Sequence, residues 1–399
     1  MTDPTALRAA LVEMLRQKGA ARTPAIADAF AGVPRHLFVP DVSIEEAYQD
    51  RVIATKRLDS GEVVSSSSQP EIMAIMLEQL DVRPGHRVLE IGAGTGYNAA
   101  LLAHLVGPAG PVVAADIDEA IVAGARAHLA AAGVGGVRVV CADGWAGVPD
   151  GAPYDRIVLT VGAHDIAPAW RARLAPGGRL VLPLALPAVQ AAIAFDEREG
   201  GLESVSVRGC LFMRLRGSSA MARRRVAVGP EPAPAVWPRG DHTIDGAATH
   251  ARLLTPPKEL ATDLGVRNWD LYDRLVFWLA LHAPSSAWLT AEGPALSTKL
   301  VPALFDGGGE QAATFGLFER ESVALLVRRA TIPGERGSRR LGLGRRRPTG
   351  SLGAARPRAP DRAAVRAASG RDRAPARLHA ARARLAGCGT VRALERSLP

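Results

Sequence analysis

The sequence is poor in the residues that build metal-bound or disulfide-linked domains. It has three cysteines in 399 residues, Cys141, Cys210 and Cys388, and no CxxC pair brings two of them together. Its nine histidines show no HExxH or comparable spacing. These absences exclude a disulfide framework and a zinc knuckle, and we predict no metal site. The sequence also lacks a GxSxG elbow, which excludes the common serine hydrolase arrangement.

Long hydrophobic runs are missing as well. No stretch offers the roughly 18 uninterrupted apolar residues of a membrane-spanning helix. The first residues, MTDPTALRAALVEMLRQKGA, do not combine a basic leader with an apolar run and a small-residue cleavage site. We therefore expect a cytoplasmic protein without a membrane partner. The hydrophobic fraction of 47% is still sufficient for a sizeable buried core.

Positive charge is concentrated in the last part of the chain. Residues 331–399 contain 17 of the 49 Lys and Arg but only 4 of the 40 Asp and Glu. The remaining residues hold 32 basic against 36 acidic groups, so the net charge of +9 reflects the tail. A mildly acidic body disfavours nucleic acid as the main partner. The Arg-rich tail keeps a nucleic-acid methyltransferase or binding protein as an alternative, because arginines bind phosphates.

Apolar segments alternate with helical patterns in the middle of the chain. RVLEIG, PVVAADI, VRVVCAD and YDRIVLTVG are short apolar runs bounded by Gly, Pro or Asp, with amphipathic stretches between them. This pattern is typical of a parallel sheet covered on both faces, so we predict an α/β fold with a doubly wound, mostly parallel sheet. The later segments AAIAFDE and LESVSVRGCLFMRLRG alternate more and predict antiparallel strands that close the sheet.

Composition divides the chain into four parts. We expect N-terminal helices, an irregular stretch and a polar serine loop in residues 1–80, the sheet domain in 81–216, and a small C-terminal module of unknown fold in 217–329. Residues 330–399 form an Arg/Ala-rich tail without aromatic residues or lysine. Such a segment buries too little apolar surface to offset its ordering entropy, so we predict disorder. An out-of-frame reading of a GC-rich gene is an alternative explanation for its composition.

A glycine-rich turn joins the first strand of this pattern to a helix in VLEIGAGTGYNAALLA. Gly92, Gly94 and Gly96 do not match the dinucleotide fingerprint GxGxxG, whose last glycine is replaced by tyrosine here. Glu90 precedes the loop, and an acidic neighbour favours a ligand with a cationic centre over a pyrophosphate. Asp116 ends the next strand, 20 residues after Gly96. A carboxylate at this place can accept hydrogen bonds from ribose hydroxyls.

The segment EIGAGTG resembles motif I of class I S-adenosylmethionine-dependent methyltransferases. Within that superfamily, VPRHLFVP, AYQD, SSSQP, YDRIVLTVGA and LAPGGRLVLPL resemble protein-L-isoaspartate O-methyltransferases in order and spacing, over about residues 5–216. The resemblance implies a Rossmann-like fold, S-adenosyl-L-methionine as the cofactor, and methyl esterification of L-isoaspartyl carboxylates in proteins or peptides. It also implies a set of cofactor-binding residues: Glu90, Gly92, Gly94, Gly96, Asp116 and, near the adenine, Asp143 and Gly144. For Asp116 and Asp143, a helix cap is the competing interpretation.

The resemblance also assigns a role to the hydroxyls of VVSSSSQPEI. Aligned on Gln69 and Pro70, the serine of the family's Thr-Ile-Ser-Gln-Pro-like segment falls on Ser68, and its threonine falls on Ser66. A carboxylate acceptor, with a reference pKa of about 4, is already ionised at pH 7 and needs orientation rather than a base. Ser68 is therefore the predicted catalytic residue, as a hydrogen-bond donor to the acceptor. The competing interpretation is that Ser68 or Gln69 caps the helix that begins at Pro70.

The sequence departs from the family pattern just upstream of these serines. RLDSGEVVSSSSQP stands where the repair enzymes have a PLPIGxGQTIS-like run, and further residues follow the sheet domain. Similar divergent, extended members resemble enzymes that methylate an aspartate in ribosomally made peptides. Repair of damaged proteins and tailoring of a specific peptide both remain open at this point.

Overall fold

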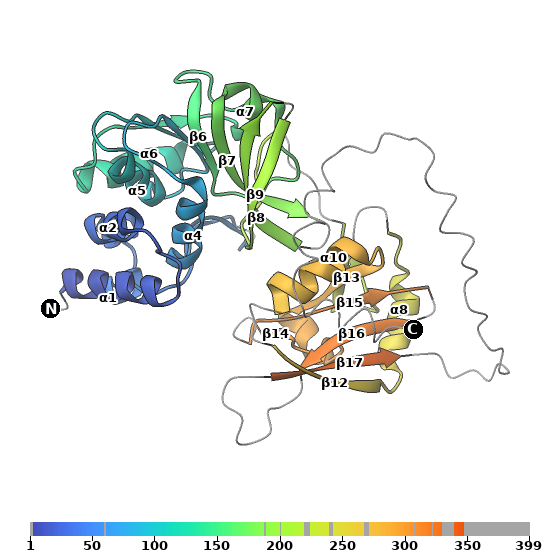
Figure 1. Cartoon of the computed structure of the whole chain (residues 1–399). Coiled ribbons are helices and arrows are strands. Elements are labelled where there is room, and N and C mark those ends of the chain that lie inside the picture. Colours follow the sequence, from blue (N-terminus) through green and yellow to red (C-terminus); the bar gives the residue numbers. More distant parts are fainter. Residues whose placement is uncertain are drawn as a thin grey trace. The chain divides into compact units, whose positions relative to one another are not determined.

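The computed structural model of the chain contains a seven-stranded sheet, an eight-stranded sheet and a two-stranded hairpin (Figure 1). Among the described residues, no helix is long and apolar enough to cross a membrane. The described residues are 3–59, 61–186, 189–199, 201–218, 224–238, 242–266, 271–306, 309–320, 322–328 and 339–346.

The seven-stranded sheet has the strand order β5-β4-β3-β6-β7-β8-β9. The strands from β5 to β7 are parallel, whereas β8 and β9 are antiparallel. Both the mostly parallel α/β sheet and its antiparallel closure are thus confirmed. The strands are β3 Val88–Ile91, β4 Val112–Asp116, β5 Val137–Cys141, β6 Tyr154–Leu159, β7 Leu174–Leu186, β8 Val189–Arg198 and β9 Gly201–Gly209.

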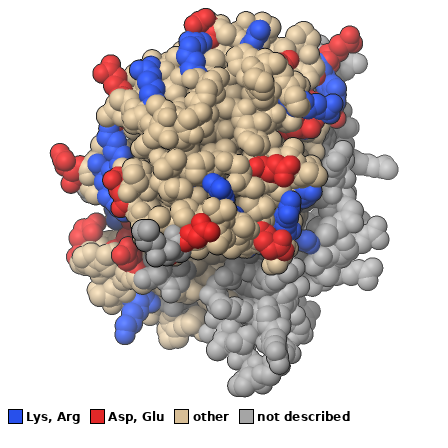
Figure 2. Space-filling model, turned by 90° about the vertical axis from the view of Figure 1, so that its left-hand side faces the viewer, with Lys and Arg blue, Asp and Glu red and all other residues tan. Residues whose placement is uncertain are grey.

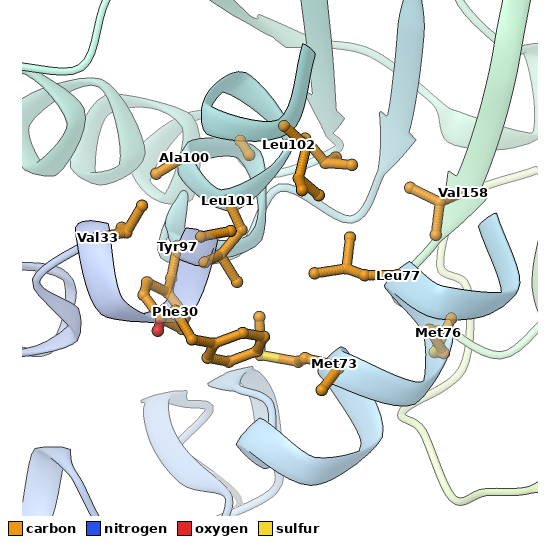
Figure 3. Close-up of a cluster of buried hydrophobic side chains, with 14 of the residues drawn as sticks. Phe30, Val33, Met73, Met76, Leu77, Tyr97, Ala100, Leu101, Leu102 and Val158 are labelled. Atoms are coloured by element: carbon orange, nitrogen blue, oxygen red, sulfur yellow. The ribbon is translucent and has the colours of Figure 1, made fainter. Parts of the chain in front are cut away.

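Helices cover both faces of this sheet because alternate strand residues point to opposite sides. Val88 and Val158 belong to a buried cluster with helices on one face, part of which Figure 3 shows. Leu89 and Ile157 belong to a second cluster with Trp170 on the other face. The first cluster includes α1 Pro4–Gln17, α2 Pro24–Gly32, η1 Arg35–Phe38, α4 Pro70–Leu80, α5 Tyr97–Val106 and α6 Glu119–Ala131. The second includes α7 Pro168–Arg173. Because α1 and α2 belong to the first cluster, the N-terminal helices share their core with the sheet.

A hairpin replaces the irregular stretch and polar loop that we predicted before α4. The short helix α3 (Ile44–Ala47) leads to β1 (Ile53–Arg57), which pairs antiparallel with β2 (Val63–Ser67). The prediction failed because a run of serines is typical of turns and loops, and the strand alternates in burial rather than in residue type. Ser65 and Ser67 are buried, whereas Ser66 between them is half-buried.

The C-terminal part forms a second, antiparallel sheet with its own core. Its order is β10-β11-β13-β15-β16-β17-β12, with β14 paired to β15. Its strands are β10 Val226–Ala227, β11 Ala235–Trp237, β12 Lys258–Val266, β13 Ser286–Glu292, β14 Phe305–Asp306, β15 Gln311–Phe318, β16 Val323–Arg328 and β17 Arg339–Arg346. Its helices are α8 Gly246–Leu254, η3 Leu271–Val276, α10 Phe277–His282 and η4 Gly293–Thr298.

The strand β17 corrects the predicted tail. Disorder from residue 330 onward is wrong for residues 339–346, since this strand pairs with β16 on one side and β12 on the other. The prediction counted only apolar side-chain burial, whereas backbone pairing on both edges also satisfies the polar groups of a strand. The rest of the predicted tail, residues 330–338 and 347–399, lies outside the described residues.

Candidate functional site

The glycine-rich loop connects β3 to α5 at the carboxyl end of the parallel strands. Gly92, Gly94 and Gly96 have φ values of +99°, +51° and +84°, which side chains rarely adopt. The backbone N–H of Gly92 donates to the carbonyl of Ala115 at 2.8 Å, and the N–H of Gly94 donates to Asp116 Oδ2 at 3.1 Å. The loop is therefore fixed against the end of β4.

Close neighbours explain why side chains are excluded from this loop. A Cβ on Gly92 would lie 2.7 Å from Thr160 Oγ1, and one on Gly96 would lie 3.2 Å from the carbonyl oxygen of Ala125. A Cβ on Gly94 would lie 3.5 Å from the carbonyl oxygen of Ser66. The loop thus lies directly against β2, the strand that carries the serines.

One cavity of about 780 Å³ brings most of the predicted site residues together. Ser68, Glu90, Gly92, Gly94 and Asp116 all line it. Gly96, Asp143 and Gly144 are not among its lining residues. The cavity therefore joins the glycine loop to the serine strand, and it continues along α4 to β9 past Ile72, Ile75, Gln79, Ser206 and Arg208.

Glu90 is completely buried at the end of β3. Its Oε1 accepts a hydrogen bond from Asn98 Nδ2 at 2.8 Å, and its Oε2 has no partner among the described residues. Burial raises the pKa of Glu90 to about 8; the hydrogen bond from Asn98 opposes this shift and the charge of Asp116 adds to it. An ionised carboxylate was expected from the sequence, whereas a pKa above 7 favours the protonated form of Glu90 at pH 7.

Residues that carry unpartnered buried polar atoms cluster around this cavity. Within the described part of the chain, six buried side-chain N or O atoms lack a hydrogen-bond partner. Four of the six belong to residues that line the cavity: Ser67, Gln79, Glu90 and Tyr97. A buried polar group without a partner destabilises the fold by about 1–3 kcal/mol. The cavity is consequently built for a polar ligand, and the residues present fit a nucleoside-type cofactor with charged groups.

Asp116 lies at the edge of the cavity with only 11% of its side chain exposed. Besides Gly94, its carboxylate accepts from the N–H of Asp118 at 3.3 Å and lies 3.8 Å from Arg216 Nη2. The cap of α6 is Asp118, whose Oδ1 accepts from Ala120 N at 3.0 Å. The cap interpretation is therefore wrong for Asp116.

Asp143 and Gly144 have structural explanations in the described chain. Asp143 caps the short helix η2 (Gly144–Ala146), since its carboxylate accepts from the N–H of Trp145 at 3.0 Å and from that of Ser218 at 2.8 Å. These hydrogen bonds outweigh partial burial and lower the pKa of Asp143. Gly144 is required by packing, because a Cβ would lie 2.4 Å from Ile91 Cγ2. Their contact with an adenine remains a prediction.

Ser68 is half-buried between β2 and α4, and it does not cap the helix. Gln69 is the N-cap residue of α4 and makes no side-chain cap hydrogen bond. Asp50 takes that role instead: its Oδ1 accepts from the N–H of Glu71 at 2.9 Å, and its Oδ2 accepts from Lys18 Nζ at 2.7 Å. Ser68 is thus not the cap of α4, and Gln69 occupies the cap position as predicted but without a side-chain cap hydrogen bond.

Several residues that line or support the cavity were not predicted from the sequence. Thr160 follows β6, and its hydroxyl donates to the carbonyl of Gly92 at 2.5 Å. The strand-end rule that singled out Asp116 would also have found Thr160, since β6 neighbours β3. Asp50 lies within the AYQD motif, but a single sequence does not show which helix it caps. No local signal distinguishes Ser67, Gln79 or Tyr97 from ordinary buried residues.

Comparisons with known proteins agree with this geometry. The family model described as protein-L-isoaspartate(D-aspartate) O-methyltransferase matches residues 6–220. A protein-L-isoaspartate O-methyltransferase of Methanopyrus kandleri is 39% identical over 212 residues, which cover 53% of this chain and 91% of the relative. One of Methanoculleus marisnigri is 42% identical over 185 residues, covering 46% and 80%. A solved protein-L-isoaspartate O-methyltransferase structure aligns with 86% of this chain and 88% of its own, at a TM-score of 0.50 and 25% identity.

Proposed function

This chain belongs to the protein-L-isoaspartate(D-aspartate) O-methyltransferase family, and from that premise we propose that it methylates a carboxylate of L-isoaspartyl residues in proteins or peptides. The observation that carries the proposal is the shared cavity. It is lined both by the glycine loop with Glu90 and Asp116 and by Ser68. A cofactor and an acceptor in this cavity would be neighbours.

S-adenosyl-L-methionine, the family's cofactor, supplies a methyl group on a positively charged sulfur. We propose that the glycine loop lets its backbone approach closely, and that Asp116 binds the ribose hydroxyls. Glu90 faces the same cavity with one oxygen free of partners among the described residues, so it is suited to a cationic group. Asp143 and Gly144 enter this proposal only as residues near the adenine.

The acceptor end needs no general base. No histidine is found among the described residues that line the cavity, which suits an acceptor that is already deprotonated. An isoaspartyl carboxylate is ionised at pH 7, so the protein has to hold one oxygen in line with the methyl group and exclude water. We propose that the hydroxyl of Ser68 donates a hydrogen bond to this carboxylate.

Two alternatives predict different acceptors. An enzyme that tailors one peptide would use the same cavity but accept only a specific aspartyl residue. A nucleic-acid methyltransferase would need a basic surface, yet on the face shown in Figure 2 the basic side chains are interspersed with acidic ones. On this face, mixed charge offers no continuous track for phosphates. Together with the family membership, this favours a protein or peptide as the proposed substrate class.

Ser68→Ala should lower kcat by at least about tenfold while leaving affinity for S-adenosylhomocysteine within about threefold, because its contact is with the acceptor. The assay offers an L-isoaspartyl peptide, its L-aspartyl isomer and a structured RNA, with radiolabelled cofactor. Label released as methanol under mild base identifies a carboxyl ester. The matched control is Ser43→Ala, which removes a hydroxyl that caps α3.

Equal turnover by the Ser68→Ala and parent proteins would refute the role of Ser68. Base-stable label on RNA would refute carboxyl methylation altogether. Base-labile label confined to one specific aspartyl peptide would replace repair by tailoring.

Asp116→Ala should weaken S-adenosylhomocysteine binding by about tenfold or more, since hydrogen bonds to a charged group contribute about 1.5–3 kcal/mol. Calorimetry measures this affinity directly. Asp28→Ala removes an exposed carboxylate from α2 and is the control for charge. An unchanged affinity in Asp116→Ala would refute the ribose assignment.

A further inference from the structure

Arg35 is a fully buried arginine in η1, with a relative exposure of 0%. Among the described residues, no carboxylate forms an ion pair with it. Arginine is almost never fully buried unless it is paired, because removing its charge from water is unfavourable. The position therefore requires an explanation.

The guanidinium contacts four different segments of the chain. Its Nε donates to the carbonyl of Ala47 at 2.9 Å, and its Nη2 donates to the carbonyl of Ser68 at 3.0 Å. Its Nη1 lies 3.8 Å from Met73 Sδ, and its central carbon lies 5.0 Å from the centre of the Tyr97 ring. Met73 and Tyr97 are both part of the buried cluster in Figure 3.

These contacts connect the two ends of the proposed active site. Tyr97 is the first residue of α5 and directly follows Gly96 of the glycine loop, whereas Ser68 is the proposed acceptor-binding residue. We propose that Arg35 is a positioning residue that holds Ser68 at a fixed place relative to the glycine loop. It acts through the backbone of Ser68, so that the Ser68 hydroxyl faces the acceptor carboxylate. This inference rests on the proposed function.

An arginine suits this task better than other residues. Its planar fork presents N–H groups in fixed directions, and its flat face stacks on an aromatic ring. A lysine at this site would offer one compact ammonium group, which does not span the carbonyls of Ala47 and Ser68 in one plane. An apolar residue would avoid the burial of a charge but would leave the Ser68 carbonyl without this donor.

A second arginine, Arg156, provides a matched control at the other end of α4. Arg156 Nε donates to the carbonyls of Leu80, at 2.8 Å, and Asp81, at 3.1 Å, where α4 ends. Both arginines thus bind backbone carbonyls at the ends of α4, but only Arg35 contacts Ser68. Loss of either should destabilise the fold, whereas only loss of Arg35 should disturb the acceptor site.

The test is a pair of double-mutant cycles on kcat with the isoaspartyl peptide. Arg35→Met should lower kcat by about tenfold or more, and adding Ser68→Ala to it should lower kcat by less than about threefold further, because both changes disable the same contact. Arg156→Met combined with Ser68→Ala should multiply the two single effects. Multiplicative effects for Arg35 and Ser68 would overturn the proposal. If Arg35→Met does not fold, Arg35→Lys takes its place in the cycle, with the same non-additive result expected.

Hydrogen exchange separates this inference from the proposed function, because it needs no activity. Arg35→Met or Arg35→Lys should speed amide exchange at residues 65–69 by about tenfold, while Arg156→Met should speed it near residues 79–82 instead. Normal protection of residues 65–69 in the Arg35 variants would overturn the positioning role. If this exchange result is obtained but isoaspartyl peptides are not methylated, the positioning role stands and the substrate assignment fails.

Discussion

Glu90→Gln should remove the fall in stability that Glu90 is expected to cause between pH 5 and pH 8. In the parent, the free energy of unfolding should decrease with pH by up to about 1.4 kcal/mol per unit in this range, from this group alone. Glutamine is neutral at every pH and has nearly the same shape as the protonated acid. The variant should therefore be about as stable as the parent at pH 5 and clearly more stable at pH 8.

The direction follows from where the proton is held. The pKa of Glu90 is raised from an ordinary value of 4.5 to about 8 in the folded chain, with burial as the largest cause. Between these two values the unfolded chain has lost the proton and the folded chain has kept it, so folding takes up a proton. The stabilisation is complete below pH 4.5, and it is lost as the pH rises through 8.

Urea denaturation at pH 5, 6, 7, 8 and 9 measures this slope. Glu119→Gln, which makes the same change at an exposed position in the first turn of α6, should keep the slope of the parent. Equal slopes in the parent and in Glu90→Gln would contradict the buried, protonated state of Glu90. The two slopes have to be compared because burial also lowers the pKa of His36 and His86, which contributes a slope of opposite sign in both proteins. Since a cationic ligand favours the ionised carboxylate, cofactor binding at pH 7 should also release protons, which calorimetry in buffers of different ionisation enthalpy detects.

The sheet and the cofactor end of the site were predictable because their signals are local. Continuous apolar runs bounded by Gly and Asp specify buried parallel strands, and the carboxyl ends of such strands meet at one edge. Glu90 and Asp116 come together for this reason, although they are distant in sequence. Thr160 follows the same rule.

The acceptor end was less predictable because its structure depends on pairing between segments. Ser65 and Ser67 are buried by the hairpin with β1 and not by their own hydrophobicity. Asp50 supplies the side-chain cap of α4 from a distant segment. Since Ser68 already stood at a plausible capping position, the sequence did not point to Asp50. β17 likewise exists through its two neighbouring strands rather than through its composition. Local composition does not report such contacts.

Gly92→Ala should be the most damaging single substitution of the glycine loop. A residue with a side chain at φ +99° is strained by about 1–3 kcal/mol. The new methyl group would also lie 2.7 Å from Thr160 Oγ1 and 2.9 Å from Val161 Cγ1. Overpacking of this kind destabilises the folded chain by about 1–3 kcal/mol more. The variant should lose about 2–6 kcal/mol in the free energy of unfolding.

Two other glycine substitutions separate these contributions. Gly133→Ala places a methyl group at φ +65° with no atom within 4 Å, so it measures backbone strain alone. Gly94→Ala, at φ +51°, places its methyl group 3.5 Å from the Ser66 carbonyl oxygen and 3.9 Å from that of Gly92, which are ordinary contact distances, so the fold should tolerate it better. Its methyl group lies between the loop and the serine strand, however, where a cofactor backbone contact is proposed.

Affinity for S-adenosylhomocysteine and thermal unfolding should therefore diverge across this series. Gly92→Ala should weaken both, since displacement of Thr160 breaks its 2.5 Å hydrogen bond to the Gly92 carbonyl and moves the loop. Gly94→Ala should weaken binding by about tenfold with little loss of stability, whereas Gly133→Ala should lower stability slightly and leave binding unchanged. If Gly92→Ala binds S-adenosylhomocysteine and unfolds like the parent, the prediction is wrong. The loop would then adapt to a side chain, and the close approach of Thr160 would not require glycine at position 92.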